Sequence, residues 1–89
     1  MQFEFDPEKS RLNKIKHNID FIEAQVLWDD DDLVEIPAKT VGEPRLIVIG
    51  TISDRYWSGI VTFRGETIRI ISVRRSRTEE VALYENRRI

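Results

Sequence analysis

The chain has 89 residues, of which 40% are hydrophobic and 34% are charged, with a net charge of −2. This length allows a single domain, residues 1–89, with a modest hydrophobic core. No run approaches the roughly 18 apolar residues of a membrane-spanning helix, and the first residues do not resemble a secretion signal. We therefore expect a cytoplasmic protein without membrane contacts, and the absence of cysteine excludes disulfides and thiolate metal sites.

Charge is unevenly divided between the two halves of the sequence. Residues 1–44 carry five basic and eleven acidic side chains, whereas residues 45–89 carry nine basic and five acidic ones. All nine of those basic residues are arginines, whose planar guanidinium groups bind phosphate through two hydrogen bonds. The division predicts either an anionic partner for the second half or two oppositely charged faces that attract each other within one fold.

The first elements expected are a very short strand and a helix. Residues 3–5 alternate between apolar and polar side chains, as in a strand. Asp6 and Pro7 are typical of the N-cap and the first turn of a helix. Leu12 and Ile15, three residues apart, would form the narrow apolar stripe with which this helix packs on the core.

A second helix is expected directly after the first, which Asn18 can end in the left-handed conformation. Asp20 and Glu23 have the spacing of a capping box at the start of the second helix. Its inner face would carry three apolar side chains at helical spacing, namely Phe21, Ala24 and Trp28.

The remaining sequence predicts four strands and a C-terminal helix. The strands are expected at residues 33–36, 46–49, 60–63 and 67–73. Pro37 would stop the first strand, residues 54–58 would form a turn, and residues 65–66 would join the last two strands in a hairpin. Ser76 and Glu79 have the spacing of a capping box for the last helix. Two N-terminal helices, an antiparallel sheet of about four strands and one C-terminal helix make an α+β fold.

The strongest candidate for a functional site is the segment 67–77. Strict alternation would place Ile68, Ile70 and Ser72 on one face of the strand, and Thr67, Arg69, Ile71 and Val73 on the other. Arg69 must then reach a carboxylate or lie in an open groove, because burying an unpaired charge is costly. Arg74, Arg75 and Arg77 follow at the entrance to a helix, whose N–H groups also attract anions. The cluster indicates either a phosphate-binding site or a solvated basic edge that prevents strand-to-strand aggregation.

Four other features have two interpretations each. His17 is the only histidine, and it could transfer protons or simply end a helix and interact with its dipole. Residues 29–32 are four aspartates without the spacing of a calcium loop, which indicates a solvated turn or an acidic patch for a basic partner. Glu43 and Arg45 could form a structural ion pair or belong to a site. Trp57, in the expected turn, more simply covers the end of the core than stacks on a base.

Four segments, taken in order along the chain, resemble the BrnT family of toxins from bacterial type II toxin–antitoxin systems. They are F-D-P-E-K at 5–9 with the asparagine at 13, K-H-N-I-D-F at 16–21, E-P-R at 43–45, and I-R-I-I-S-V-R at 68–74 with the glutamates and tyrosine beyond it. Phe5 stands where the family more usually has tryptophan, and Asn18 where it has glycine.

The resemblance implies a RelE-like fold and an endoribonuclease that needs no metal or other cofactor. Its partners would be the RNA substrate and a BrnA-like antitoxin, with DNA contacted only through the antitoxin. Without a metal, the ribose 2′-OH must attack the phosphate, and the site must supply a proton acceptor, a proton donor and cations. The candidate catalytic residues are Arg69, Arg74, His17, Tyr84 and Glu79, with Glu43 a further candidate for proton transfer, and the candidate RNA contacts are Lys16, Arg45, Arg64, Arg75 and Arg77. The alternative function is a non-catalytic module, a decayed toxin that binds nucleic acid or protein.

Overall fold

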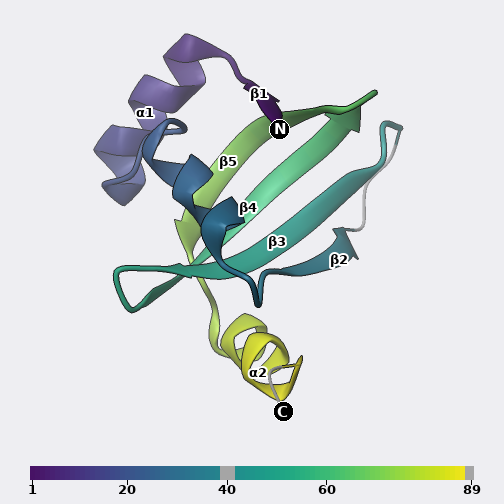
Figure 1. Cartoon of the computed structure of the whole chain (residues 1–89). Helices are drawn as coiled ribbons and strands as arrows, with labels where there is room; N and C mark the ends of the chain where they lie inside the picture. Colours follow the sequence, from purple (N-terminus) through teal and green to yellow (C-terminus); the bar gives the residue numbers. More distant parts are fainter. Residues whose placement is uncertain (39–41, 88–89) are drawn as a thin grey trace.

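A computed structural model describes residues 1–38 and 42–87, and in these residues it contains a five-stranded sheet and three helices (Figure 1). The elements are β1 (Gln2–Glu4), α1 (Pro7–His17), the 3₁₀-helix η1 (Glu23–Asp29), β2 (Val34–Ala38), β3 (Arg45–Ile52), β4 (Arg55–Arg64), β5 (Thr67–Arg75) and α2 (Thr78–Arg87). The expected α+β class is confirmed. None of the helices in this part of the chain has the length and apolar character that crossing a membrane requires.

The sheet is mixed, with strand order β1-β5-β4-β3-β2. Strands β2 to β5 form an antiparallel meander, and β1 adds to β5 in parallel. The expectation of about four antiparallel strands was therefore wrong by one strand. The pairing of β1 could not be read from local sequence, because its first residue, Gln2, lies opposite Thr67, which is distant along the chain.

Helix α1 begins and ends where expected but packs through different residues. The Asp6 carboxylate accepts a hydrogen bond from the backbone N–H of the second residue after it (2.9 Å), and Asn18 ends the helix at φ +62°. The expected apolar stripe was wrong: Leu12 is 49% exposed and Ile15 is 71% exposed. The buried side of α1 is polar instead, because Asn13 on that side satisfies backbone groups of the sheet and of the following loop.

The second predicted helix is the seven-residue 3₁₀-helix η1. The expected capping box is present, since Glu23 N–H donates to the Asp20 carboxylate and Asp20 N–H donates to the Glu23 carboxylate. A 3₁₀-helix repeats every three residues. The inner row is therefore Phe21, Ala24 and Leu27, all fully buried, whereas the predicted Trp28 is only partly buried.

Two expected boundaries in the sheet were wrong. Strand β2 runs past Pro37, which an edge strand tolerates because the missing N–H faces away from the ladder. The expected turn at 54–58 is reduced to Ser53 and Asp54, both with positive φ, so that Trp57 lies within β4 and is buried. The tight turn before β5 is confirmed, with Gly65 at φ +62°.

A β-bulge interrupts the pairing of β4 with β5. Ile60 lies opposite Ser72, whereas the next residue, Val61, lies opposite Ile70. Ile71 is therefore an extra residue with no partner in the register, and the alternation of side chains shifts by one at this point.

The bulge changes which side chains of β5 share a face. Val73 joins Ile68 and Ile70 in the core, instead of pointing away from them as strict alternation predicted. Arg69 and Arg74 are five residues apart, so an unbroken strand would place them on opposite faces. The bulge between them places both on the face away from the core.

Helix α2 begins later than the predicted capping box. The N–H of Ser76 still bonds the carbonyl of Tyr56, so the chain leaves the sheet only after this residue. Glu80, rather than Glu79, then accepts a hydrogen bond from the N–H of Arg77 (2.8 Å) and caps the helix start.

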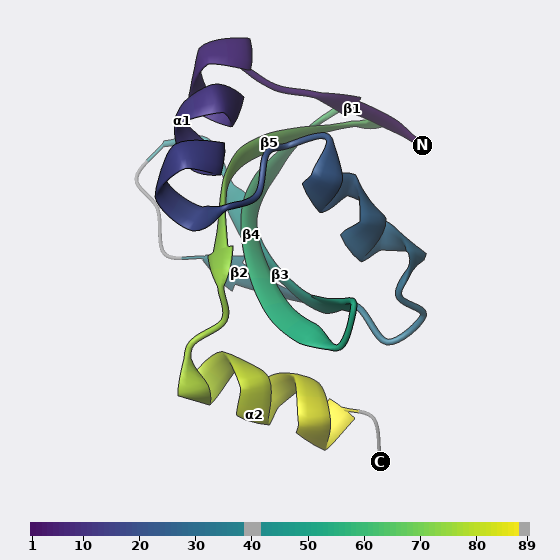
Figure 2. The same cartoon turned by 90° about the vertical axis from the view of Figure 1, so that its left-hand side faces the viewer.

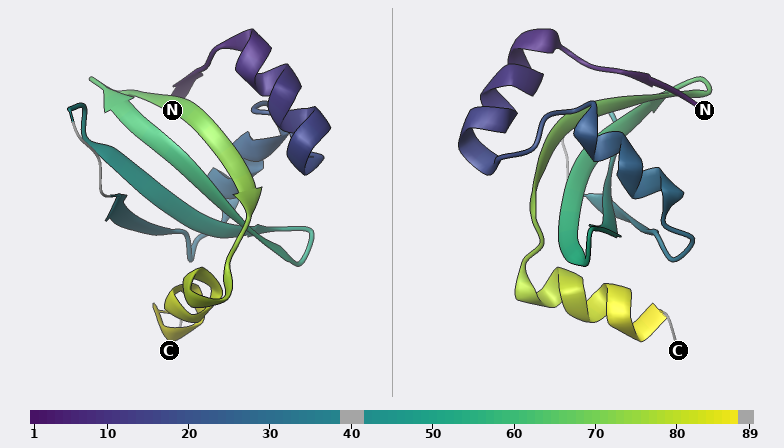
Figure 3. Two further views of the ribbon diagram at one scale, coloured as in Figure 1. Left: turned by 180° about the vertical axis from the view of Figure 1, so that it is seen from behind. Right: turned by 60° about the vertical axis from the view of Figure 1, so that its left-hand side comes forward.

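The two faces of the sheet are covered to different extents (Figures 2 and 3). Helices α1 and η1 lie on the side where the main core is formed by Phe21, Leu27, Val48, Val61, Ile70 and their neighbours. On the other side, α2 packs only at one end of the sheet, where Val34, Ile49 and Tyr84 form a second cluster. No helix of the described residues covers the remainder of this side, which we call the open face (Figure 3, left).

Candidate functional site

A row of polar side chains crosses the open face. Arg69 of β5 lies opposite Thr62 of β4 and opposite Glu4 of β1. The antiparallel register extends the row to Arg45, at the start of β3. We call Glu4, Arg69, Thr62 and Arg45 the polar row. The row contains two arginines that could bind a phosphate chain lying across the strands.

Carboxylates lie close to the arginines of the polar row. A guanidinium nitrogen of Arg69 is 3.6 Å from a Glu4 oxygen, and the Nε of Arg64 is 3.7 Å from Glu4 and 3.6 Å from Glu43. The Thr62 hydroxyl donates to the same Glu43 oxygen (3.1 Å). These ion pairs are longer than hydrogen bonds and are partly exposed, so each contributes little stability. A phosphate could therefore replace the carboxylates at small cost. The sequence predicted that Arg69 either reaches a carboxylate or lies in an open groove. In the structure it approaches the Glu4 carboxylate and also lies on the uncovered face of the sheet.

Arg74 lies on the same side of the sheet, at the border between the open face and α2, and is held by Glu80. Two guanidinium nitrogens donate to the two carboxylate oxygens at 2.7 and 2.8 Å. The Ser58 hydroxyl and the Arg77 N–H also donate to Glu80, which is only 6% exposed. Hydrogen bonding from Arg74 is the main cause that lowers the pKa of Glu80 to about 2, and the same contact raises the pKa of Arg74. The pair fixes the Arg74 side chain where β5 meets α2.

The distance between Arg69 and Arg74 follows from the register. Their partners on β4 are Thr62 and Ser58, which are four residues apart and therefore share a face. At about 3.3 Å per residue, the two positions are roughly 13 Å apart along the strand. Cations at this spacing could contact different phosphates of one RNA strand.

His17 and Lys16 lie at the edge of the sheet rather than on the open face. Asn13, one helical turn before His17, bonds the backbone N–H and carbonyl of Val73 at the edge of β5. Residues four apart lie on the same side of a helix. His17 is therefore beside the C-terminal half of β5 and is partly buried, whereas Lys16 is exposed.

Tyr84 lies inside the second cluster. It is 2% exposed, and its hydroxyl donates to an Asp30 oxygen (2.8 Å) that also accepts bonds from the N–H and hydroxyl of Thr51. Burial raises the pKa of Asp30, but the hydrogen bonds from Asp32 N–H, Tyr84 and Thr51 outweigh burial and leave this pKa below its usual value. The contact ties α2 to η1 and β3, a role in packing.

The other predicted contacts lie around the start of α2. Arg75 stacks over the Trp57 ring, 5.4 Å from its centre, on the core side of the sheet. Arg77 and Glu79 are exposed, and the backbone N–H of Arg77 is used by Glu80. None of these three side chains belongs to the polar row.

Two carboxylates at the site were not among the predicted residues. The capping-box pattern pointed to Ser76 and Glu79, and it missed Glu80 because Arg77, whose N–H donates to Glu80, has no hydroxyl or carboxylate side chain to complete a box. Glu4 gave no local indication, because only the parallel pairing of β1 with β5 brings it to Arg69.

The aspartates at 29–32 line a shallow hollow of about 350 Å³ together with Val26 and the turn at Ser53. Asp30 is used within the fold, and the other three aspartates are exposed or partly exposed at the surface. Across the described ranges 1–38 and 42–87, no group of three or more acidic or histidine side chains is arranged to hold a metal ion.

The comparison with known families gives one match. The sequence model described as the ribonuclease toxin BrnT of type II toxin–antitoxin systems matches residues 5–80. No curated protein matches the chain at a significant level. The family match covers most of the sequence and includes every predicted catalytic and RNA-binding residue except Tyr84. The chain therefore belongs to the BrnT family of ribonuclease toxins of type II toxin–antitoxin systems.

Proposed function

We propose that this chain is an endoribonuclease toxin that cleaves RNA on its open face, without a metal, by attack of a ribose 2′-OH. The observation that carries the proposal is the shared side of the sheet: the β-bulge at Ile71 aligns Arg69 and Arg74 on the side away from the core, with Arg69 on the open face and Arg74 at the border of that face with α2. Bulges often occur beside active sites because they redirect side chains.

Arg69 is the residue that stabilises the transition state. The 2′-oxygen forms a bond to the adjacent phosphorus while the bond from phosphorus to the 5′-oxygen breaks, and negative charge accumulates on the phosphoryl oxygens. A guanidinium group matches these oxygens and cannot itself act as the base, because it does not lose its proton. Arg45 and Arg64 bind neighbouring phosphates, and Arg74, held by Glu80, contacts the strand further along β5.

Glu43 is the proton acceptor for the 2′-OH. The four candidates for proton transfer were His17, Glu43, Glu79 and Tyr84. Glu43 is the one beside the polar row, because Thr62, which donates to it, lies directly opposite Arg69. His17, at the edge of β5, is our candidate for protonating the leaving 5′-oxygen. The product ends are then a 2′,3′-cyclic phosphate and a 5′-hydroxyl.

In the cell, this cleavage would inhibit translation and growth. A BrnA-like antitoxin would neutralise the toxin and would provide the only link to DNA. This part of the proposal rests on the family membership.

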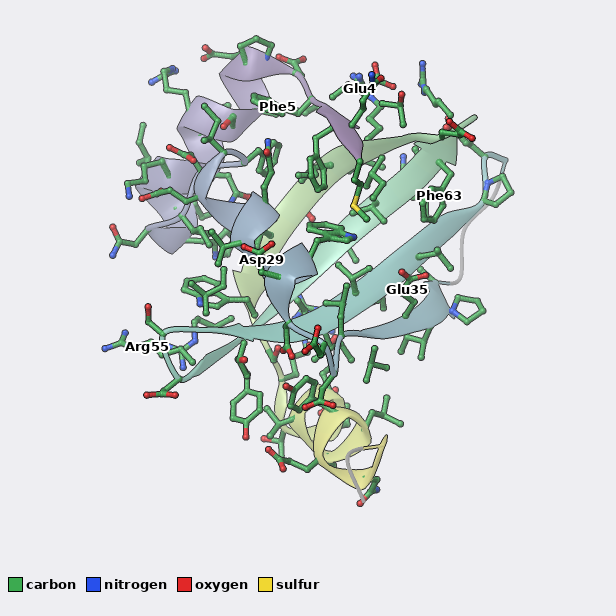
Figure 4. The ribbon with its side chains drawn as sticks, viewed as in Figure 1. Glu4, Phe5, Asp29, Glu35, Arg55 and Phe63 are labelled. Carbon is green, nitrogen blue, oxygen red and sulfur yellow. The ribbon has the colours of Figure 1, made fainter. Side chains whose placement is uncertain are left out.

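The test is cleavage of RNA by the purified chain in the presence of a chelator. Arg69→Ala should lower the cleavage rate by roughly 100- to 1000-fold, the usual cost of losing one charge-stabilising group. Arg55→Ala is the matched control, because Arg55 lies at the opposite end of the sheet from Glu4 of the polar row (Figure 4). Full activity of Arg69→Ala, or activity that needs an added metal, would contradict the proposal. Tight RNA binding without cleavage by the unaltered chain would instead support the non-catalytic alternative.

A further inference from the structure

We infer that a band of isoleucines beside the polar row is a shelf for an unpaired nucleobase, so that the site takes single-stranded RNA. The inference rests on the proposed function and adds to it the form of the substrate. The observation behind it is a second row of residues across the strands, next to the polar row, which consists of apolar rather than charged side chains.

The shelf consists of Ile36, Ile47 and Ile60. These residues lie opposite one another across β2, β3 and β4, and Ser72 of β5 follows Ile60 in the same row. All three isoleucines are partly exposed. They form the row next to the polar row on the open face.

Helix α2 borders the shelf, and Ile36 and Ile47 pack against the second cluster, to which Tyr84 of this helix belongs. The helix covers the next row, in which Val34, Ile49 and Ser58 are 2%, 0% and 1% exposed. One side of the shelf is thus bounded by the packed end of the sheet and the other by the polar row. Among the three isoleucines, Ile60 is the one that neither belongs to nor packs against a buried cluster.

The spacing of the two rows suits one nucleotide. Rows on one face of a sheet are two residues apart, or about 7 Å along the strands. A phosphate on Arg69 places its ribose over the boundary between the rows and its base over Ile60 and Ile47. A base in a duplex is stacked and paired, and cannot lie flat on a protein surface, whereas single strands expose their bases for such contacts.

Charge favours RNA over a protein segment as the occupant. The polar row that borders the shelf on its open side includes two arginines, at 45 and 69, and Arg64 lies one row further along β4. A repeating phosphate chain matches such a row, and its bases match the apolar band beside it.

The experiment measures binding of non-cleavable 2′-O-methyl RNA to the purified full chain at fixed salt. Three probes are compared: a single-stranded 12-mer, the same strand in a duplex, and a backbone of equal length without bases. The unaltered chain should bind the single strand about three- to ten-fold more tightly than the abasic backbone, and also more tightly than the duplex. Ile60→Thr, which keeps a β-branched side chain, should remove most of the preference for bases. Ile22→Thr, at an exposed isoleucine of the opposite side, should retain it.

Equal binding of the single strand and the abasic backbone by the unaltered chain would overturn the inference, as would an Ile60→Thr variant that keeps the preference. An Ile60→Thr variant that loses binding to the partner antitoxin but not to RNA would overturn it too, and would identify the shelf as a protein contact. Because the probes cannot be cleaved, the shelf is tested separately from catalysis. A chain that prefers unpaired bases but cuts no RNA would contradict the proposed function alone.

Discussion

Among the single residues of the site, Glu80 makes contacts with the largest number of elements. Its carboxylate accepts hydrogen bonds from Arg74, Ser58 and the Arg77 N–H, and thereby connects β5, β4 and the start of α2. A buried carboxylate of this kind is stable only while it is ionised and fully bonded. Its protonation is therefore expected to weaken the attachment of α2.

This coupling predicts how stability depends on pH. The pKa of Glu80 is about 2 in the folded chain and about 4.5 in the unfolded one, so the ion pair stabilises the fold above pH 4.5 and is lost as the pH falls toward 2. Glu80→Gln should lower the free energy of unfolding by about 2–3 kcal/mol at pH 7, and the difference from the unaltered chain should shrink between pH 5 and pH 2. Urea unfolding at several pH values measures this difference. Glu79→Gln, at the exposed neighbour, should show almost no difference at any pH.

Glu43 allows the proposed chemistry to be separated from RNA binding. Replacing Glu43 with glutamine removes the proton acceptor but keeps the shape of the side chain and its contact with Thr62. The cleavage rate should fall by roughly 100-fold or more, as is usual for a general base, while the affinity for non-cleavable RNA changes little. Single-turnover cleavage and equilibrium binding measure the two effects. A loss of affinity with an unchanged rate would indicate that Glu43 only orients the arginines.

Helix α1 shows, at the level of elements, that polar contacts can replace an apolar stripe. β1 pairs with β5 only along residues 67–69, which leaves the backbone of Val73 at an open edge. The Asn13 amide fills this gap by bonding both backbone groups of Val73 and the carbonyl of Ile19. The same contact aligns α1, and with it His17, beside β5.

Two neighbouring substitutions in α1 test this packing. An apolar stripe would make Leu12 the more important residue for stability, whereas the structure makes it Asn13. Asn13→Ala should lower the free energy of unfolding by about 2–4 kcal/mol, because buried backbone groups lose their partners. Leu12→Ala should change it by less than about 0.5 kcal/mol, because this side chain is half exposed. Denaturant unfolding of the two variants tests the packing of α1, and the reverse order would contradict it.

For the whole molecule, part of the uneven charge of the two halves is used within the fold, as one of the two expected explanations requires. Acidic residues of the first half, Glu4 and Glu43, lie against Arg64 and Arg69 of the second half. Three of the aspartates at 29–32 remain at the surface, on the side of η1. The ion pairs of the open face are long, so its arginines can exchange carboxylates for phosphates.

The exchange predicts a salt dependence for RNA binding. Each phosphate contact to a single strand contributes about 0.7 to the slope of log affinity against log salt concentration. Arg45→Gln should weaken binding at low salt and lower the slope by about that amount. Arg55→Gln, which changes net charge equally at the far end of the sheet, should leave the slope unchanged. An equal effect of both variants would indicate a contribution of net charge alone.

Much of the fold was predictable, because its determinants are local. The N-cap at Asp6, the end of α1 at Asn18, the capping box at Asp20 and Glu23 and the hairpin turn at Gly65 all depend on neighbouring residues. The family segments and the arginine cluster also follow from the sequence. The site was predictable only as a set of candidates, since residue types indicate a possible chemistry but not which side chains meet.

The sequence by itself determined the class of the fold, most of the helix and strand positions and the membership of a toxin family. The tertiary structure alone decided which residues share a surface. An extra residue at Ile71 reverses the alternation of β5, and a parallel strand from the other end of the chain brings Glu4 to Arg69. Both depend on pairing between distant segments, which no local pattern encodes, because the free energy of pairing is set by the partner strand as much as by the strand itself.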